Sequence, residues 1–154
     1  MIKEIFLFIN TYYFINLGEY ILHKISHNKN FGFLYKWHHY HHVIEFPYYQ
    51  LTTDIYPQTN KLENIYIYFI ILWWIVMYYI LEFYYFNILF IESLIYVIWI
   101  DKMHESYHLN NSIFEKFEWF RKKKELHLLH HKKTFLNLNL FDFTSDKLLK
   151  TYEN

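Results

Sequence analysis

The chain has 154 residues, the length of one domain, and its fifteen basic and fifteen acidic side chains cancel. Such a balance gives no electrostatic reason to expect nucleic acid as a partner. Cysteine is absent, which excludes disulfides, iron–sulfur clusters, thiolate-ligated haem and zinc ribbons, so any metal must use imidazole or oxygen ligands. Aromatic residues make up 25% of the chain, which indicates burial in lipid or around a lipid-shaped cavity.

The first apolar stretch runs from Ile5 to Leu22. It lacks the basic start and small-residue cleavage site of a signal peptide, so we expect a first membrane helix there. A polar, basic and histidine-rich segment follows from His23 to His42. Pro47 and Pro57 then mark a loop that runs to about Asn64.

Two further apolar stretches, 65–81 and 83–100, follow this loop, and the first of them carries no charge. As one helix, these 36 residues would measure about 54 Å, well beyond a hydrocarbon core of about 30 Å. We therefore predict two membrane passes with a tight turn near Glu82 to Asn87. The alternative is a buried core hairpin of a soluble protein, because 17 uncharged residues lie at the lower edge of a membrane span.

The basic residues favour the membrane interpretation. If 65–100 crosses and returns, fourteen of the fifteen Lys and Arg lie on the face that carries both histidine-rich halves, and Lys3 alone lies opposite. Basic side chains favour the cytoplasmic side. The expected fold is therefore all-α, an integral membrane helical protein with a cytosol-facing histidine-rich helical cap, in a single domain over 1–154. We expect an endoplasmic reticulum-type membrane. The run 121–124 is expected to be a solvated helix face that binds anionic headgroups.

Ten of the eleven histidines fall into four boxes that form the same pattern twice, on either side of the predicted hairpin. The H-x3-H boxes are His23 with His27 and His104 with His108, and the H-x2-H-H boxes are His38, His41 and His42, and His127, His130 and His131. His39 stands outside the pattern.

These spacings have a physical meaning. Residues i, i+3 and i+4 share one face of a helix, so two imidazoles can chelate one ion, and an adjacent His-His pair can divide between two ions. Neutral imidazole suits iron, zinc and copper. Ten imidazoles exceed the need of one ion, so the pattern predicts two ions with about five nitrogens each. An even number of crossings between the halves would bring them together on one side.

The boxes resemble those of the fatty acid hydroxylase and sterol desaturase superfamily, over about residues 18–152. Three segments carry the resemblance: Glu19–His27 is similar to E-Y-x-x-H-R-x-x-H, Leu34–His42 to the second box, and Asn137–Leu148 to the N-x-N…F-T-x-x-W-D-R-L ending. The chain departs from the family in having room for only one helix before the first box, and in having Ser145 where tryptophan is usual.

The resemblance implies that the ten boxed histidines hold two iron ions, for which zinc can substitute, and that dioxygen serves as co-substrate. It implies hydroxylation or desaturation of a lipid C–H bond. The sequence has no obvious haem or flavin module, so electrons should come from a membrane partner such as cytochrome b5 and its reductase. Metal-bound histidines usually donate their second N–H to a carboxylate or carbonyl. The carboxylates beside the boxes, Asp101, Glu19 and Glu105, are therefore candidates for that role, with Asp101 preferred.

The substrate is open between a sterol and a fatty-acyl lipid. The spacing from His42 to Pro47 and Pro57 is similar to sterol C-5 desaturases and C-4 methyl oxidases, which slightly favours sterol, while Asp101 to His108 resembles the third box of fatty-acyl and ceramide hydroxylases. Two other functions stay open: a non-catalytic or inactive shortened relative that binds metal, and a membrane haem protein with two histidine ligands.

Overall fold

The computed structural model describes residues 2–57 and 66–154. Over these two ranges the protein is helical and has no strand, apart from one isolated parallel bridge between Thr53 and Leu109. The elements are α1 (Ile2–Ser26), η1 (Lys29–Phe31), α2 (Gly32–Tyr40), η2 (His41–Glu45), α3 (Tyr66–Ile80), α4 (Phe83–Tyr107), η3 (Ile113–Lys116), α5 (Glu118–Lys132) and α6 (Thr144–Leu148). Of these, η1 and η3 are 3₁₀ turns and η2 is a π-helical turn. The all-α prediction is confirmed for this part of the chain.

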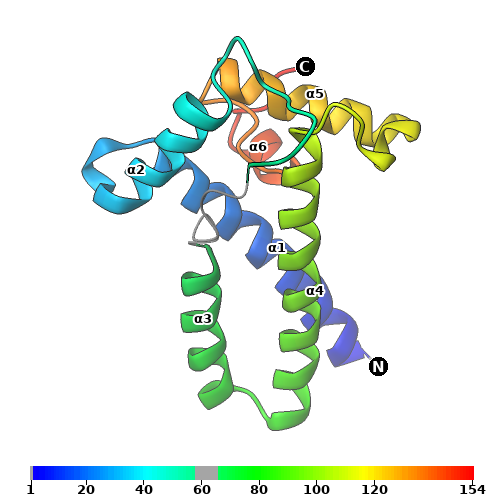
Figure 1. The fold of residues 1–154 in the computed structure, drawn as a ribbon. Helices are drawn as coiled ribbons and strands as arrows, with labels where there is room; N and C mark the ends of the chain where they lie inside the picture. Colours follow the sequence, from blue (N-terminus) through cyan, green and yellow to red (C-terminus); the bar gives the residue numbers. More distant parts are fainter. Residues whose placement is uncertain (1, 58–65) are drawn as a thin grey trace.

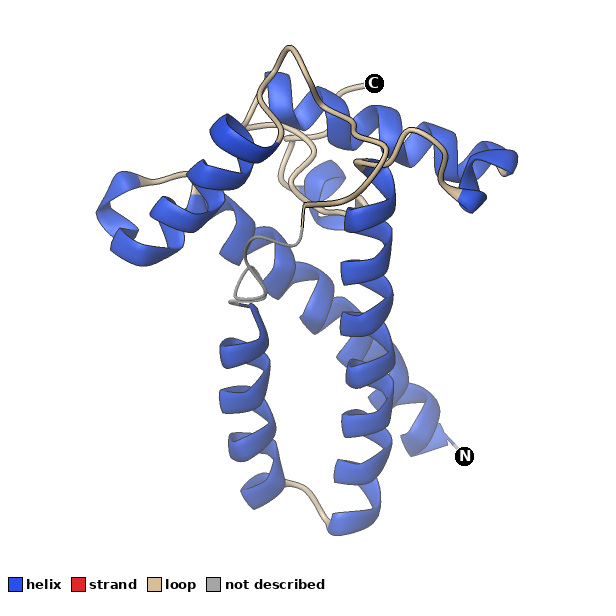
Figure 2. Cartoon of the chain, viewed as in Figure 1, coloured by secondary structure: helices blue, strands red, loops and turns tan. Residues whose placement is uncertain are grey.

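The elements form two tiers (Figure 1). The α3–α4 hairpin and the N-terminal part of α1 form the first tier, while α2, α5, α6 and the C-terminus gather at the other end. Loops are concentrated in this second tier, and the first tier has only the short α3–α4 connection (Figure 2). We call the second tier the cap.

Within residues 2–57 and 66–154, two helices are long and apolar enough to cross a membrane. They are α1 and α4, each of 25 residues or about 37 Å, whereas α3 has 15 residues and measures about 22 Å. In the most apolar windows of α1 and α4, only 28% and 17% of the residues are buried. Both helices extend beyond the predicted apolar spans, because no glycine or proline ends them there, and they carry His23 and His104 into the cap.

The turn between α3 and α4 lies earlier than predicted. It consists of Leu81 and Glu82, while Asn87 lies inside α4 and donates from Nδ2 to the carbonyl of Phe83 at 2.7 Å. Glu82 reverses the chain with an extended backbone, φ −58° and ψ 143°, a conformation open to any residue. The turn therefore needs neither glycine nor proline, which is why the sequence does not mark it.

A small apolar core joins α4 to α5 in the cap. Met103, Tyr107 and Phe120 are each fully buried, and Trp99 and Phe114 pack against them. The basic run at 121–124 borders this core and has partners within the chain. Lys124 donates to the Leu109 carbonyl at 2.6 Å and pairs with Glu115, Lys123 donates to the Phe141 carbonyl, and Lys122 pairs with Glu118 at 2.7 Å. Part of the run therefore braces the cap.

Candidate metal centre

The ten boxed histidines lie together in the cap as two groups of five. Within each group, one ring nitrogen from every histidine lies within 4.8 Å of the others, close to the span of about 4.2 Å across a metal ion with 2.1 Å bonds to nitrogen. The first group is His23, His27, His38, His42 and His130, and the second is His41, His104, His108, His127 and His131. Each group could hold a metal ion. His39 is exposed and its ring stacks on Tyr35 instead.

The two groups are built by an exchange between the halves of the chain. Each half contributes four histidines to its own group, as two pairs spaced i, i+4, and lends the histidine at i+3 to the other group. The lent residues are His41 and His130. Adjacent residues on a helix point about 100° apart, so His41 and His42 separate between the groups, as do His130 and His131. The predicted division of the His-His pairs is therefore the one the structure has.

The local backbone conformation sets the direction of the boxed histidine side chains. His23 lies in the last turn of α1 and His27 follows it, with their rings stacked at 5.4 Å. His41 and His42 lie in the π-helical turn η2, a rare geometry that often occurs at functional sites. The rings of His42 and His131, one from each group, stack with their centroids 3.9 Å apart, so the two groups are in contact there.

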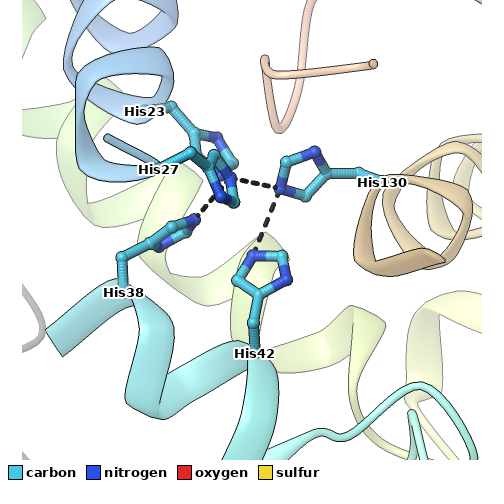
Figure 3. Close-up of side chains that lie close together, drawn as sticks. All are labelled: His23, His27, His38, His42 and His130. Atoms are coloured by element: carbon cyan, nitrogen blue, oxygen red, sulfur yellow. Dashed lines mark hydrogen bonds between the residues drawn. The ribbon is translucent and has the colours of Figure 1, made fainter. Parts of the chain in front are cut away.

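The imidazoles of the first group converge through their Nε2 atoms (Figure 3). Nε2 of His27 lies 2.9 Å from that of His38 and 3.2 Å from that of His130, which in turn lies 3.2 Å from Nε2 of His42. The second group has the same arrangement, with 3.1 Å between His104 and His41 and 2.9 Å between His127 and His108.

In four of the ten imidazoles the opposite ring nitrogen is anchored to the protein. A carbonyl can only accept, so each Nδ1 beside one must carry the proton, which leaves Nε2 with a free lone pair in the neutral ring. These Nδ1 atoms donate to main-chain carbonyls in both groups: His23 to Leu138, His130 to Leu136 at 2.8 Å, His108 to Leu51 at 2.8 Å, and His131 to Phe46 at 3.3 Å. The anchors fix the tautomer and direct the lone pairs inward.

This donor set fits a metal ion. In each group one buried Nε2, that of His23 and that of His131, has no hydrogen-bond partner among the residues that the structure describes. Burial, reinforced by neighbouring imidazoles, lowers the pKa of His27 to about 3, so its ring is uncharged near neutral pH and can offer a nitrogen lone pair to a cation. For the same reasons the pKa lies well below the ordinary value at His38, His41, His42, His108, His127, His130 and His131. Converging lone pairs without protons are costly to bury unless a cation satisfies them.

An irregular segment near the C-terminus, residues 136–140, anchors the first group. The carboxylate of Asp146 accepts the N–H groups of Leu138 and Asn139, both at 2.8 Å. Glu19 accepts the N–H of Leu140 at 2.7 Å. Asn137, with φ 51°, adopts the left-handed conformation that asparagine tolerates, and it exchanges two hydrogen bonds with the Glu153 backbone. We call 136–140 the strap, since its carbonyls hold His23 and His130.

The three carboxylates predicted to support the histidines occupy different places. Glu19 holds the strap, two residues from the carbonyl that His23 uses. Glu105 pairs with Lys102 at 2.7 Å. Asp101 is exposed and lines a cavity with His104.

Sequence reasoning missed Glu45, whose Oε2 lies 3.4 Å from Nδ1 of His41. The signal that could have found it is its i, i+4 spacing from that histidine. It also missed the carbonyls of Phe46 and Leu51, because the backbone groups that meet a ring cannot be deduced from residue types.

An apolar cavity of about 170 Å³ opens beside the histidines, more than ten times the 10–15 Å³ that one water requires. It lies among α1, α2, α3 and α4. Four histidines line it, two from each group: His23 and His38, and His41 and His104. One apolar space therefore reaches both groups.

Comparisons with protein-family models, curated proteins and solved structures gave no match. The resemblance to the hydroxylase and desaturase superfamily therefore rests on the histidine boxes and the ending alone.

Proposed function

We propose that the protein is a membrane-embedded oxidoreductase that holds one iron ion in each histidine group and uses dioxygen to hydroxylate or desaturate a lipid. The observation that carries the proposal is the convergence of ten imidazoles in two groups of five beside one apolar cavity. When bound, two reduced iron ions would supply the dioxygen activation needed to remove hydrogen from an unactivated C–H bond.

The chain's own residues would bind the lipid, orient it and exclude water from the site. The strap and the loop carbonyls hold four of the ten imidazoles in one tautomer, so those nitrogen donors are preorganised. The cavity would place a lipid chain against both groups and keep bulk water from the reacting carbon. A sterol and a fatty-acyl lipid are both compatible with an apolar lining, and the Pro47 and Pro57 spacing is the reason for a slight preference for sterol. Electrons would come from a cytochrome b5-type partner and its reductase.

The membrane assignment has two supports. The apolar windows of α1 and α4 are mostly exposed, the reverse of a core helix in a soluble protein. In addition, nearly all the basic residues lie in or next to the histidine-rich halves. We therefore propose an endoplasmic reticulum-type membrane, with the cap on the cytosolic face.

The haem alternative fits the geometry poorly. A haem with two histidine ligands needs one imidazole on each side of a flat ring, whereas five nitrogens of each group converge within 4.8 Å. The non-catalytic alternative is decided by experiment.

The test is metal analysis combined with lipid profiling after expression in a sterol-producing host. We expect about two irons per chain, no Soret band, and a new hydroxylated or desaturated lipid. The variant His41→Ala should lose the product and iron, while His39→Ala is the matched control because His39 is exposed and outside both groups. Intact iron with unchanged lipids, in the presence of a working electron donor, would favour the non-catalytic relative.

A further inference from the structure

The cavity beside the histidines has a polar end and an apolar end. Its polar lining residues, such as Glu19, Ser26 and Asp101, accompany the histidines at the cap end. From there it follows α1 for about 13 Å, from His23 back to Phe14. A single-chain lipid would therefore fit with its polar end at the cap and its tail along α1.

Two stacked rings lie at the apolar end. Phe14 and Trp73 are the lining residues farthest along α1 and α3 from the cap, and their ring centroids are 4.9 Å apart with planes 21° from parallel. Phe14 keeps 54% of its surface exposed. The stack is therefore a thin partition between the cavity and the apolar phase outside, and it joins α1 to α3.

Gly18 lies one helical turn closer to the histidines on the same lining face of α1. Among the described residues, a Cβ added there would meet no atom within 4 Å. The space beside Gly18 is therefore open, and a large side chain at this position would project into it.

We propose that the Phe14–Trp73 stack closes the cavity and sets the longest alkyl chain that the protein accommodates, while Gly18 keeps the path to the stack open. The occupant is the unbranched alkyl tail of a lipid whose polar end lies at the cap, so the shape of the cavity favours the fatty-acyl substrate over the sterol that the Pro47 and Pro57 spacing slightly favours. This inference rests on the proposed function for the reaction, but the length limit is a property of the cavity itself. Removal of the Phe14 ring would open the next turn of α1, roughly 5 Å of further depth.

The test measures binding without turnover. A photoreactive fatty acid and a saturated fatty acid competitor of increasing length are equilibrated with the purified full chain in lipid nanodiscs, and irradiation then crosslinks the probe that is still bound. Displacement should improve with length up to a limit. We expect Phe14→Ala and Trp73→Ala to move this limit to longer chains and Gly18→Phe to move it to shorter chains or abolish crosslinking. The conservative variants Trp73→Phe, which keeps a ring, and Gly18→Ala should retain the wild-type limit.

Phe6→Ala is the matched control, because Phe6 is an exposed phenylalanine of α1 that does not line the cavity. An unchanged limit in Phe14→Ala, with crosslinking intact, would overturn the proposal, as would the absence of displaceable crosslinking in the wild type. A clear limit in a protein that makes no oxidised lipid would instead reject the proposed function and leave the length limit standing.

Discussion

His41 and Glu45 lie one turn apart in η2, with 3.4 Å between Nδ1 of the histidine and Oε2 of the carboxylate. Both side chains are almost fully buried, at 4% and 3% exposure. His41 is the histidine that the N-terminal half lends to the second group, and its Nε2 lies 3.1 Å from that of His104. Glu45 therefore lies within ion-pair distance of the one imidazole that links the first pair of boxes to the second group.

Replacement of Glu45 should weaken metal binding in the second group. Loss of such a partner typically costs 10- to 100-fold in metal affinity, so we expect Glu45→Ala to lie in that range and Glu45→Gln to lie between it and the wild type. Chelator competition on the purified protein measures the effect. Glu118→Gln, which removes an exposed carboxylate paired with Lys122, is the control. Equal affinities in Glu45→Ala and the control would show that Glu45 does not support the site.

Asp146 should be important for stability, because its carboxylate accepts two main-chain N–H groups and the hydroxyl of Thr151 at 2.7 Å, all near the strap. Asp146→Ala leaves these donors without their partner, which we expect to lower the free energy of unfolding by about 2–4 kcal/mol. Thermal unfolding in detergent measures the loss. Asp54→Ala, at an exposed carboxylate that accepts from Asn110, should change stability by less than about 0.5 kcal/mol. Similar values for the two variants would contradict the role of Asp146.

Much of the site could be predicted from residue spacing. The i, i+4 periodicity of a helix determines which histidines pair, and the 100° step between neighbours predicts that His41 separates from His42. What could not be predicted depends on contacts distant in the chain. The strap meets His23 through a carbonyl 115 residues away, and neither its leucine side chains nor their spacing indicate this. The α3–α4 turn was misplaced because an extended backbone at Glu82 suffices for the reversal.

The basic run offers a matched pair of lysines. The side chain of Lys124 is 12% exposed and bonds to Leu109 and Glu115, whereas that of Lys122 is 71% exposed and pairs only along its own helix with Glu118. We expect Lys124→Met to destabilise the protein by about 1–3 kcal/mol and Lys122→Met to leave its stability almost unchanged. Denaturant unfolding compares them. If the two variants were equally stable, the bracing role of Lys124 would be wrong.

Acid should destabilise the metal-free protein through its buried imidazoles. Histidine titrates near 6.5 in an unfolded chain, whereas burial lowers the pKa of His27 to about 3. Between these values the unfolded chain binds more protons, so the free energy of unfolding decreases as the pH falls from 6.5 towards 3. Each such imidazole contributes a slope of up to about 1.4 kcal/mol per pH unit. Unfolding measured with chelator present should show a shallower slope in His27→Gln than in His39→Gln, and identical slopes would refute the assignment.

The absence of cysteine makes the membrane topology directly testable. Single cysteines can be placed at exposed positions in the cap, Phe33 and Trp119, and at Tyr79 beside the α3–α4 turn. Exposed tyrosines around that turn, Tyr78, Tyr79 and Tyr84, match the aromatic belts found at membrane interfaces. We therefore expect a membrane-impermeant maleimide to label Phe33→Cys and Trp119→Cys from the cytosolic side and Tyr79→Cys only from the other. The two cap positions must behave alike, since their histidines meet within a few ångströms. Labelling of Phe33→Cys and Trp119→Cys from opposite sides would be incompatible with a shared metal centre.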